Sequence, residues 1–210
     1  QQEANRLASI PGVQGTAVSL MAPMEGEMGG VMFRPSGDTV RFGGDWGISG
    51  NGVGPGYFST VGIRLVDGRD VAVTDVTGSS PVVVLSESAA RDAWPGQRAV
   101  GQCVVIGRKT DPCSTVVGVV SDANLVNITP EPPAHYYTPV TQSTYIRSLA
   151  ISVRGPRDVR TTVAQTIRHD LADRLPASST IRIEDLRSTL DPRYAQWTEG
   201  AVVFTAMGIL

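Results

Sequence analysis

The stretch that decides the fold is PVVVLSESAARDAWPG, residues 81–96. Its first five residues, 81–85, are apolar without a break, and such a run is typical of a strand that is covered on both faces. Ser86 is suited to begin a helix, because its hydroxyl can accept a hydrogen bond from a free N–H of the first turn. The helix is predicted to continue to Ala93 and to end at the Pro-Gly pair 95–96. The chain therefore combines a buried strand with a helix that follows it directly.

Further strands are predicted around this stretch, so that the middle of the chain, about residues 26–140, is β-rich. They are expected near residues 31–34, 45–53, 102–106 and 113–120, the last two being the arms of a hairpin. Residues 54–62 predict a short helix that a proline begins and a glycine ends. Residues 24–30 contain glycine, glutamate and methionine without periodicity and predict a loop, and the proline-rich residues 129–133 predict rigid extended chain.

The two ends of the chain predict a second unit. The first ten residues are typical of a helix, and residues 13–21 of a strand. Residues 149–153 alternate apolar and polar side chains as a half-buried strand does, and another such strand is expected at 181–183. Between these two strands, apolar residues recur every fourth position and predict an amphipathic helix; they are Val159, Val163, Ile167, Leu171 and Leu175. Strand, helix and strand form a βαβ-type unit whose sheet the opening helix and strand can complete.

The composition excludes several classes of protein. The chain has 210 residues, a net charge of -2, and 18% charged residues, so collagen-like, coiled-coil and disordered classes do not fit. Lys109 is the only lysine among the 18 basic residues, and no basic stripe of the kind that binds nucleic acid is present.

The last ten residues, 201–210, form an apolar run. Two interpretations remain open for it. The run is either part of a core helix or the start of a transmembrane helix, which needs about 20 apolar residues in all. The second interpretation predicts that residues 193–210 begin a membrane span and that the chain is a loop domain of a membrane protein.

The two cysteines lie on opposite arms of the predicted hairpin. With Cys103 directly opposite Cys113, their Cα atoms would be about 4.5 Å apart, within the range of a disulfide. Two buried free thiols are the alternative, and a metal site lacks further ligands because both histidines lie elsewhere. A disulfide would indicate an oxidising compartment outside the cytosol.

Side chains that could carry out catalysis or bind metal have plainer structural interpretations. Ser86 follows a strand and precedes a helix, as a nucleophile does in many hydrolases, but its neighbours lack the glycines of that strained turn, so helix capping is expected. His135 and His169 are expected to be packed or exposed structural residues. The glycines of 50–56 are expected to shape a loop or bulge, because Pro55 has no N–H and no P-loop lysine follows. No catalytic, cofactor or metal constellation is predicted.

Methionines gather between residues 21 and 32. Met21, Met24, Met28 and Met32 are spaced by about four residues, but Pro23 and the glycines between them do not favour a helix. One hypothesis is that they provide an adaptable apolar contact surface.

The ordered set of motifs resembles the extracytoplasmic domain of MacB-like ABC transporter permeases, the FtsX-related family. The stretches that carry the resemblance are 81–96, VGQ at 100–102, TVVGVVSD at 115–122, VGPGYF at 53–58, VGI at 61–63 and DGRD at 67–70. Leu7, PGV at 11–13 and the closing apolar run match the exit from the family's first membrane helix and the entry to its second. Ser86 departs from the asparagine expected there, although both residues cap helices.

The resemblance implies an α+β fold with two parts. A porter-like split βαβ subdomain would comprise residues 1–25 and 141–192, and a β-rich, Sabre-like subdomain of residues 26–140 would be inserted into it. It also implies no catalysis and no cofactor in this domain. A cytoplasmic ATPase would be the partner through the membrane helices, with a periplasmic adaptor or cargo on the outer side of the bacterial inner membrane.

Three hypotheses about function follow from these observations. The leading one is a domain that couples cytoplasmic ATP hydrolysis to export or to a periplasmic partner. The second is an FtsX-like regulator that binds and activates a cell-wall hydrolase. The third is a secreted hydrolase that uses Ser86, and a buried Ser86 hydroxyl bonded to N–H groups of its own helix would contradict it.

Overall fold

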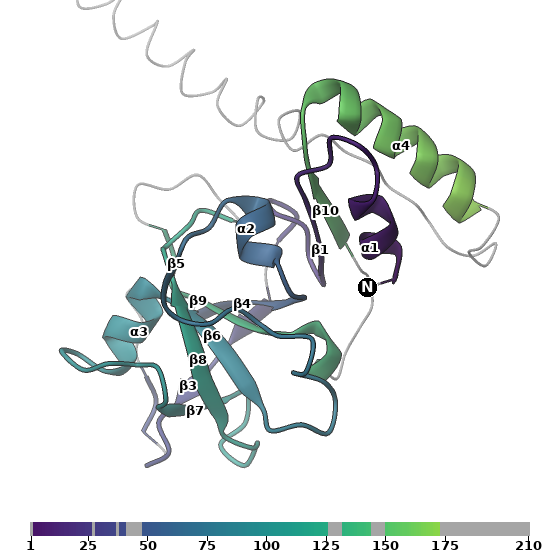
Figure 1. The fold of residues 1–210 in the computed structure, drawn as a ribbon. Helices are drawn as coiled ribbons and strands as arrows, with labels where there is room; N and C mark the ends of the chain where they lie inside the picture. Colours follow the sequence, from purple (N-terminus) through teal and green to yellow (C-terminus); the bar gives the residue numbers. More distant parts are fainter. Residues whose placement is uncertain are drawn as a thin grey trace, which may run out of the picture.

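The computed structural model describes residues 2–26, 28–36, 38–40, 48–125, 132–143 and 150–172. In these ranges the chain forms one mixed sheet with short helices around it, an α+β fold (Figure 1). The strand order is β10-β1-β4-β9-β6-β8-β7-β3, with β2 beside β4 and β5 beside β8. Two groups of elements can be distinguished around this sheet, one built on two hydrophobic clusters and the other mainly on a third.

The centre of the sheet confirms the prediction from residues 81–96. Strand β6 (Val82–Ser86) is buried at every position and lies between β8 (Ser114–Val120), which is parallel to it, and β9 (His135–Pro139), which is antiparallel. Helix α3 (Glu87–Ala93) follows at once. Strand β6 has a neighbouring strand on each side, and both of its faces are covered. An unbroken apolar run is the sequence that such a position requires.

The remaining strands of this part include three that were not predicted from the sequence, β2, β5 and β9. Those predicted are β3 (Met32–Phe33), β4 (Ile48–Val53) and β7 (Cys103–Ile106). Strand β9 was missed, although it lies between β4 and β6, because it follows the proline-rich segment and its pattern HYYTP is not alternating. The predicted loop at 24–30 is wrong at residues 28–30. These residues form strand β2 (Met28–Gly30), which pairs with β4. A short edge strand, β5 (Leu65–Gly68), pairs with β8.

Elements from the two ends of the chain lie together. They are α1 (Gln2–Ala8), β1 (Gly15–Ser19), β10 (Ala150–Arg154) and α4 (Arg157–Ala172). Strands β1 and β10 pair antiparallel from Gly15 opposite Arg154 to Ser19 opposite Ala150, as the sequence predicted for the opening strand. Leu7, Val159 and Val163 form the centre of their hydrophobic cluster. We call these four elements the end lobe and the others the central lobe.

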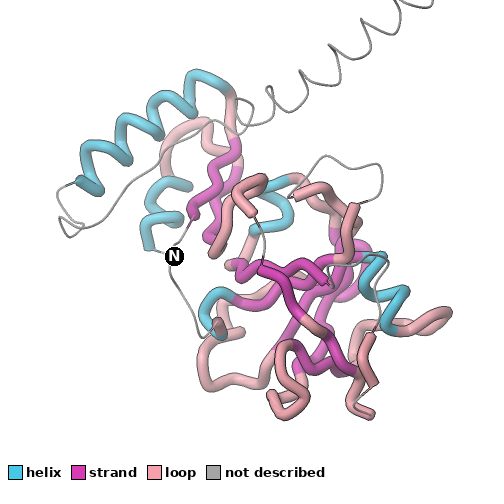
Figure 2. The backbone as a smooth tube through the Cα atoms, turned by 180° about the vertical axis from the view of Figure 1, so that it is seen from behind, coloured by secondary structure: helices cyan, strands magenta, loops and turns pink. Residues whose placement is uncertain are grey.

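Figure 1 shows the end lobe gathered on one side of the molecule, and Figure 2 shows the same division from behind. The predicted strand at 181–183 and the predicted start of a membrane helix at 193–210 lie outside the described residues. Within the ranges that are described, no helix has the length and the apolar character that a membrane span needs.

The central lobe has two hydrophobic clusters, one on each side of its sheet. One contains Met32, Leu85 and Trp94 and is covered by α3. The other contains Tyr57, Phe58 and Tyr137 and is covered by α2 (Tyr57–Val61), the short helix predicted at 54–62. Helix α2 lies on the side of the central lobe that faces the end lobe, and it contacts both β1 and β10.

Candidate functional site: the junction between the two lobes

The two lobes are joined through a narrow part of the sheet. Ser19 of β1 and Val53 of β4 are the one residue pair of the β1–β4 ladder in the described chain. Two backbone hydrogen bonds extend this contact, from the Leu20 N–H to the Gly52 carbonyl (2.8 Å) and from the Gly54 N–H to the Val18 carbonyl (2.7 Å). The sheet thus continues from one lobe into the other, but over a short length.

Helix α2 braces this narrow connection. Gly56 (φ 78°) precedes the helix and Gly62 (φ 85°) ends it, so both of its ends use a left-handed backbone that glycine adopts without cost. A Cβ at Gly15 of β1 would lie 3.0 Å from the Thr60 Oγ1 atom, and Arg154 of β10 donates from Nη1 to the Ser59 carbonyl at 3.1 Å. The end lobe therefore contacts this helix through both of its strands.

The opposite face of α2 is anchored in the central lobe by aromatic rings. The Phe58 and Tyr137 rings meet edge to face with centroids 4.9 Å apart, and the Tyr57 ring lies 6.3 Å from the Tyr137 ring. Such pairs add about 0.5–1.5 kcal/mol beyond the area that they bury. Helix α2 is thus fixed on one side to β9 and on the other to the end lobe.

The DGRD segment, residues 67–70, positions the start of α2. Asp70 accepts hydrogen bonds from the Gly56 N–H (3.1 Å) and the Val71 N–H (2.6 Å). Burial raises the pKa of the Asp70 carboxyl, although these two N–H groups and the charge of Arg69 act in the opposite direction. Asp67 holds Arg98 through two hydrogen bonds at 2.8 Å on the surface.

Arg69 and Asp75 close the loop that follows β5. Arg69 donates to both carboxylate oxygens of Asp75, at 2.7 and 3.0 Å, and the Ala72 N–H donates to the same carboxylate at 2.7 Å. Burial alone would raise the pKa of Asp75, but the hydrogen bonds from Arg69 and Ala72 and the charge of Arg69 together hold it below the ordinary value.

Replacing Asp75 by asparagine is expected to destabilise the fold in a pH-dependent way. Since the Arg69 side chain remains 47% exposed, solvent screens the pair, and the expected loss at neutral pH is about 1–2 kcal/mol. The pKa is lower in the folded protein, so the contribution of Asp75 is present above its unfolded pKa of about 3.9 and is lost as pH falls. Urea unfolding at pH 7 and pH 3 measures both effects. An equal difference between Asp75→Asn and wild type at the two pH values would contradict the pKa direction.

Ser86, His135 and Asp122 lie close together, but not as a catalytic triad. The buried Ser86 Oγ accepts hydrogen bonds from the backbone N–H groups of Ala89 (3.3 Å) and His135 (3.0 Å). Ser88 Oγ donates to the Asp122 carboxylate at 2.7 Å, so the Ser86 hydroxyl proton is directed to Ser88 Oγ at 3.0 Å. The His135 Nδ1 atom lies 2.7 Å from the Pro133 carbonyl, away from this hydroxyl chain. These bonds confirm helix capping by Ser86 and contradict the hydrolase hypothesis.

Ser86→Ala is expected to lower the free energy of unfolding by about 2–3 kcal/mol, more than an ordinary cap, because it also leaves the buried His135 N–H without an acceptor. Chemical denaturation monitored by circular dichroism measures the change. Ser59→Ala is the matched control: its exposed hydroxyl donates only to the Gly56 carbonyl of its own helix, and the expected effect is within about 0.5 kcal/mol. Equal effects of the two substitutions would contradict the second role of Ser86.

The structure also places the other residues that the sequence analysis named as candidates. Gly50 lies within β4, not in the expected loop or bulge, and a Cβ there would overlap the Tyr136 ring. Met32 and Met24 are buried, so the hypothesis of a shared methionine contact surface does not hold for these two. His169 lies in α4, and its side chain is outside the description. Among the described residues, no group of histidine, cysteine, aspartate or glutamate side chains could hold a metal ion.

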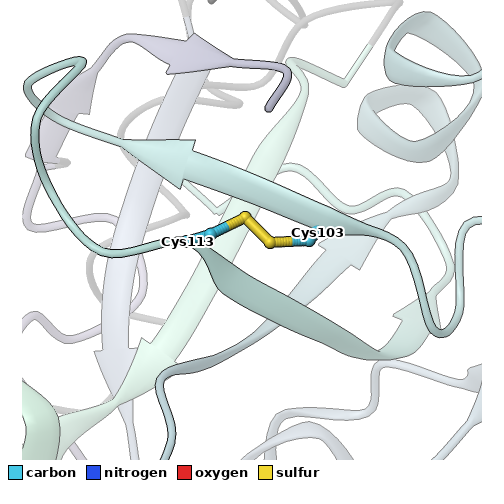
Figure 3. Close-up of a disulfide and its surroundings, with 2 residues drawn as sticks. All are labelled: Cys103 and Cys113. Carbon is cyan, nitrogen blue, oxygen red and sulfur yellow. A yellow bond between two sulfur atoms is a disulfide. The ribbon is translucent and has the colours of Figure 1, made fainter. Parts of the chain in front are cut away.

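The structure joins Cys103 and Cys113 in a disulfide (Figure 3), with their Cα atoms 5.8 Å apart. The predicted register of this hairpin was wrong by two residues, because Cys103 pairs with Thr115 and Cys113 lies just before β8. The connection between the two strands, residues 107–113, is longer than predicted. The two cysteines are therefore not directly opposite each other, and the disulfide crosses the hairpin diagonally. It closes the end of the hairpin where the β7–β8 ladder stops.

The family model of the MacB-like periplasmic core domain matches residues 3–169. The chain belongs to this family. The match extends across both lobes and includes the junction and the disulfide hairpin. The elements of the junction, α2, β1 and β10, therefore all lie in the part of this MacB-like periplasmic core domain that the family model matches.

Curated relatives support the assignment. A macrolide export ATP-binding/permease protein, MacB of Aggregatibacter actinomycetemcomitans, is 31% identical over 121 residues, which are 54% of this chain and 18% of the relative. The chain spans about a fifth of the length of the curated relatives that it matches.

Solved structures share the fold of this MacB-like domain. The periplasmic region of MacB from Actinobacillus actinomycetemcomitans has a TM-score of 0.56 at 23% identity, over 82% of this chain and 72% of that one. The extracellular domain of the ABC-type transporter YknZ from Gram-positive bacteria has a TM-score of 0.52 at 18% identity, over 80% and 83% of the two chains.

Proposed function

We propose that this MacB-like domain is a non-catalytic, extracytoplasmic part of an ABC transporter permease that transmits movement between the membrane and the space outside it. The observation that carries the proposal is the junction: one sheet runs through both lobes, and α2 contacts the end lobe on one side and the central core on the other. A displacement of β1 and β10 would therefore be passed to the central lobe through the backbone and through α2.

The division into subdomains belongs to the same proposal. In it the end lobe is the described part of a porter-like subdomain, residues 1–25 and 141–192, and the central lobe is a Sabre-like subdomain, residues 26–140. Residues 193–210 would, in this proposal, begin a membrane helix. The hydrophobic cluster around Leu7, Val159 and Val163 supports this division, because most of the end lobe packs on a core of its own, while Ala17 of β1 belongs to the cluster of Tyr57 and Tyr137.

Location and partners follow from the family and from the disulfide. The domain would lie on the outer side of the bacterial inner membrane, where an oxidising environment keeps Cys103 and Cys113 paired. Its partners would be a cytoplasmic ATPase, reached through membrane helices, and a periplasmic adaptor or cargo. A macrolide is the first cargo to test, because the named relatives are macrolide export proteins. The comparisons do not favour the alternative of a cell-wall hydrolase regulator.

The proposal can be tested with distance labels in the full-length permease in nanodiscs. Both cysteines of the domain are in the disulfide, so a single introduced cysteine can be labelled in a permease otherwise free of reactive thiols. One label replaces the 76% exposed Val73 of the central lobe, and another replaces the exposed Gln165 of α4. The distance from each label to acceptors on the lipid surface is measured with and without ATP. Both distances are expected to change together.

A junction variant makes the test specific. Arg154→Ala removes the bond to the Ser59 carbonyl, and Gly15→Val places bulk against Thr60. In this double variant the label on α4 is expected to keep its ATP-dependent change, whereas the label at position 73 loses most of it. Ser9→Ala, an exposed change in the end lobe away from α2, is the control. ATP-independent distances at both labels in the unchanged permease would overturn the proposal.

A further inference from the structure

A small cavity lies beside the junction, between the central lobe and the segment that follows β1. It is lined by Tyr57 of α2, Asn51 of β4, His135 of β9 and Leu125, and by residues of the segment 22–26. It leaves about 10 Å³ for the centre of a water molecule. That volume is enough for about one water and too small for an organic ligand.

Tyr57 brings a hydroxyl into this cavity. The side chain has no exposed surface, and its Oη atom has no hydrogen-bond partner among the described residues. Burial raises the pKa of Tyr57 to about 12, and the hydrogen-bonding influence of the nearby Asn51 side chain acts in the opposite direction. The hydroxyl therefore keeps its proton and is a donor. A buried donor that lacks an acceptor costs about 1–3 kcal/mol, so a partner within the cavity is strongly favoured.

Asn51, which also lines the cavity, supplies an acceptor. Its Oδ1 atom accepts a hydrogen bond from the Met21 N–H at 3.2 Å, and its Nδ2 atom donates to the Met21 carbonyl at 2.9 Å. An amide oxygen has two lone pairs, so Oδ1 can accept a second hydrogen bond. These two bonds also fix the chain where it leaves β1 for the central lobe.

We propose that the cavity binds one structural water, which accepts a hydrogen bond from Tyr57 Oη and donates one to Asn51 Oδ1. The water links α2 to Asn51 and, through Asn51, to Met21. It thereby connects the bracing helix to the segment by which the chain passes between the lobes. The inference concerns the packing of the junction and does not depend on the transport role.

Two measurements on the chain test this site together. A high-resolution crystal structure is expected to show a solvent peak within 2.5–3.0 Å of Tyr57 Oη, the usual O–H···O range. Tyr57→Phe is expected to raise the unfolding equilibrium constant about 2- to 10-fold, because it removes a satisfied hydrogen bond. Tyr136→Phe is the matched control, since Tyr136 does not line the cavity, and the solvent peak is expected to remain in that variant.

Other outcomes would overturn the proposal. Absence of the solvent peak in the unchanged protein would do so, whether the cavity is dry or Asn51 bonds Tyr57 directly. So would a Tyr57→Phe variant with an unchanged or smaller unfolding constant, because a hydroxyl without a partner is removed at no loss.

Discussion

Gly68→Ala is expected to lower the free energy of unfolding by about 2–5 kcal/mol, the largest effect of a single substitution that we anticipate. Gly68 has φ +72°, which alanine adopts only with strain. Its Cβ would also lie 2.3 Å from the Val117 carbonyl oxygen and 3.0 Å from the Gly118 Cα. Both of these atoms belong to the backbone of β8, so the overlap can be relieved only if β5 moves away from the sheet. Equilibrium unfolding in urea measures the loss.

Gly78→Ala separates the two causes. Gly78 has φ +89°, but a Cβ there meets nothing within 4 Å. Only the backbone strain remains, and a loss of about 1–2 kcal/mol is expected. If the two substitutions destabilised the protein equally, the close packing of β5 on β8 would not be the source of the effect at Gly68.

Removing the disulfide by replacing Cys103 and Cys113 with alanine is expected to cost about 3 kcal/mol in the chain-entropy model. The two residues are ten positions apart, so the bridge closes a short ring. Unfolding curves of the wild type with and without reductant, beside those of the double variant, measure the effect. The reduced wild type and the double variant are expected to coincide, and reductant should leave the double variant unchanged.

The thiols themselves provide an independent check. Denatured, unreduced wild type is expected to show no thiol that reacts with a labelling reagent. Two reactive thiols, together with a wild-type curve that reductant does not move, would contradict the disulfide. The inference of an oxidising compartment would then lose its support.

Much of the fold could be predicted because its signals are local. The run at 81–85 and the cap at Ser86 are adjacent in the sequence, and they became β6 and α3. The amphipathic helix α4 and the alternating strand at 149–153 were likewise predicted from periodicity within short windows.

The parts that could not be predicted depend on partners far away in the sequence. Strand β9 pairs in parallel with β4, from Ser49 opposite His135 onward, and nothing local in HYYTP indicates such a partner. The hairpin register was missed by two residues because β8 is also held by β6 and β5, not only by β7.

The junction was likewise beyond sequence reasoning. Tyr57 was recognised within a family motif, but its position beside Asn51 and His135 depends on how three separate segments pack. The second role of Ser86, accepting from the His135 N–H, requires the same tertiary arrangement.

The interleaved strand order also sets the sequence of events during synthesis. Every strand of the central lobe lies between Met28 and Pro139, so its sheet can form once that part of the chain has emerged. Strand β1 is paired along its whole length only by β10, and Arg154, the partner of Gly15, lies 139 positions after it (154 − 15). Contacts so distant form late. On the ribosome, the end lobe would therefore close last, around a central lobe that is already folded.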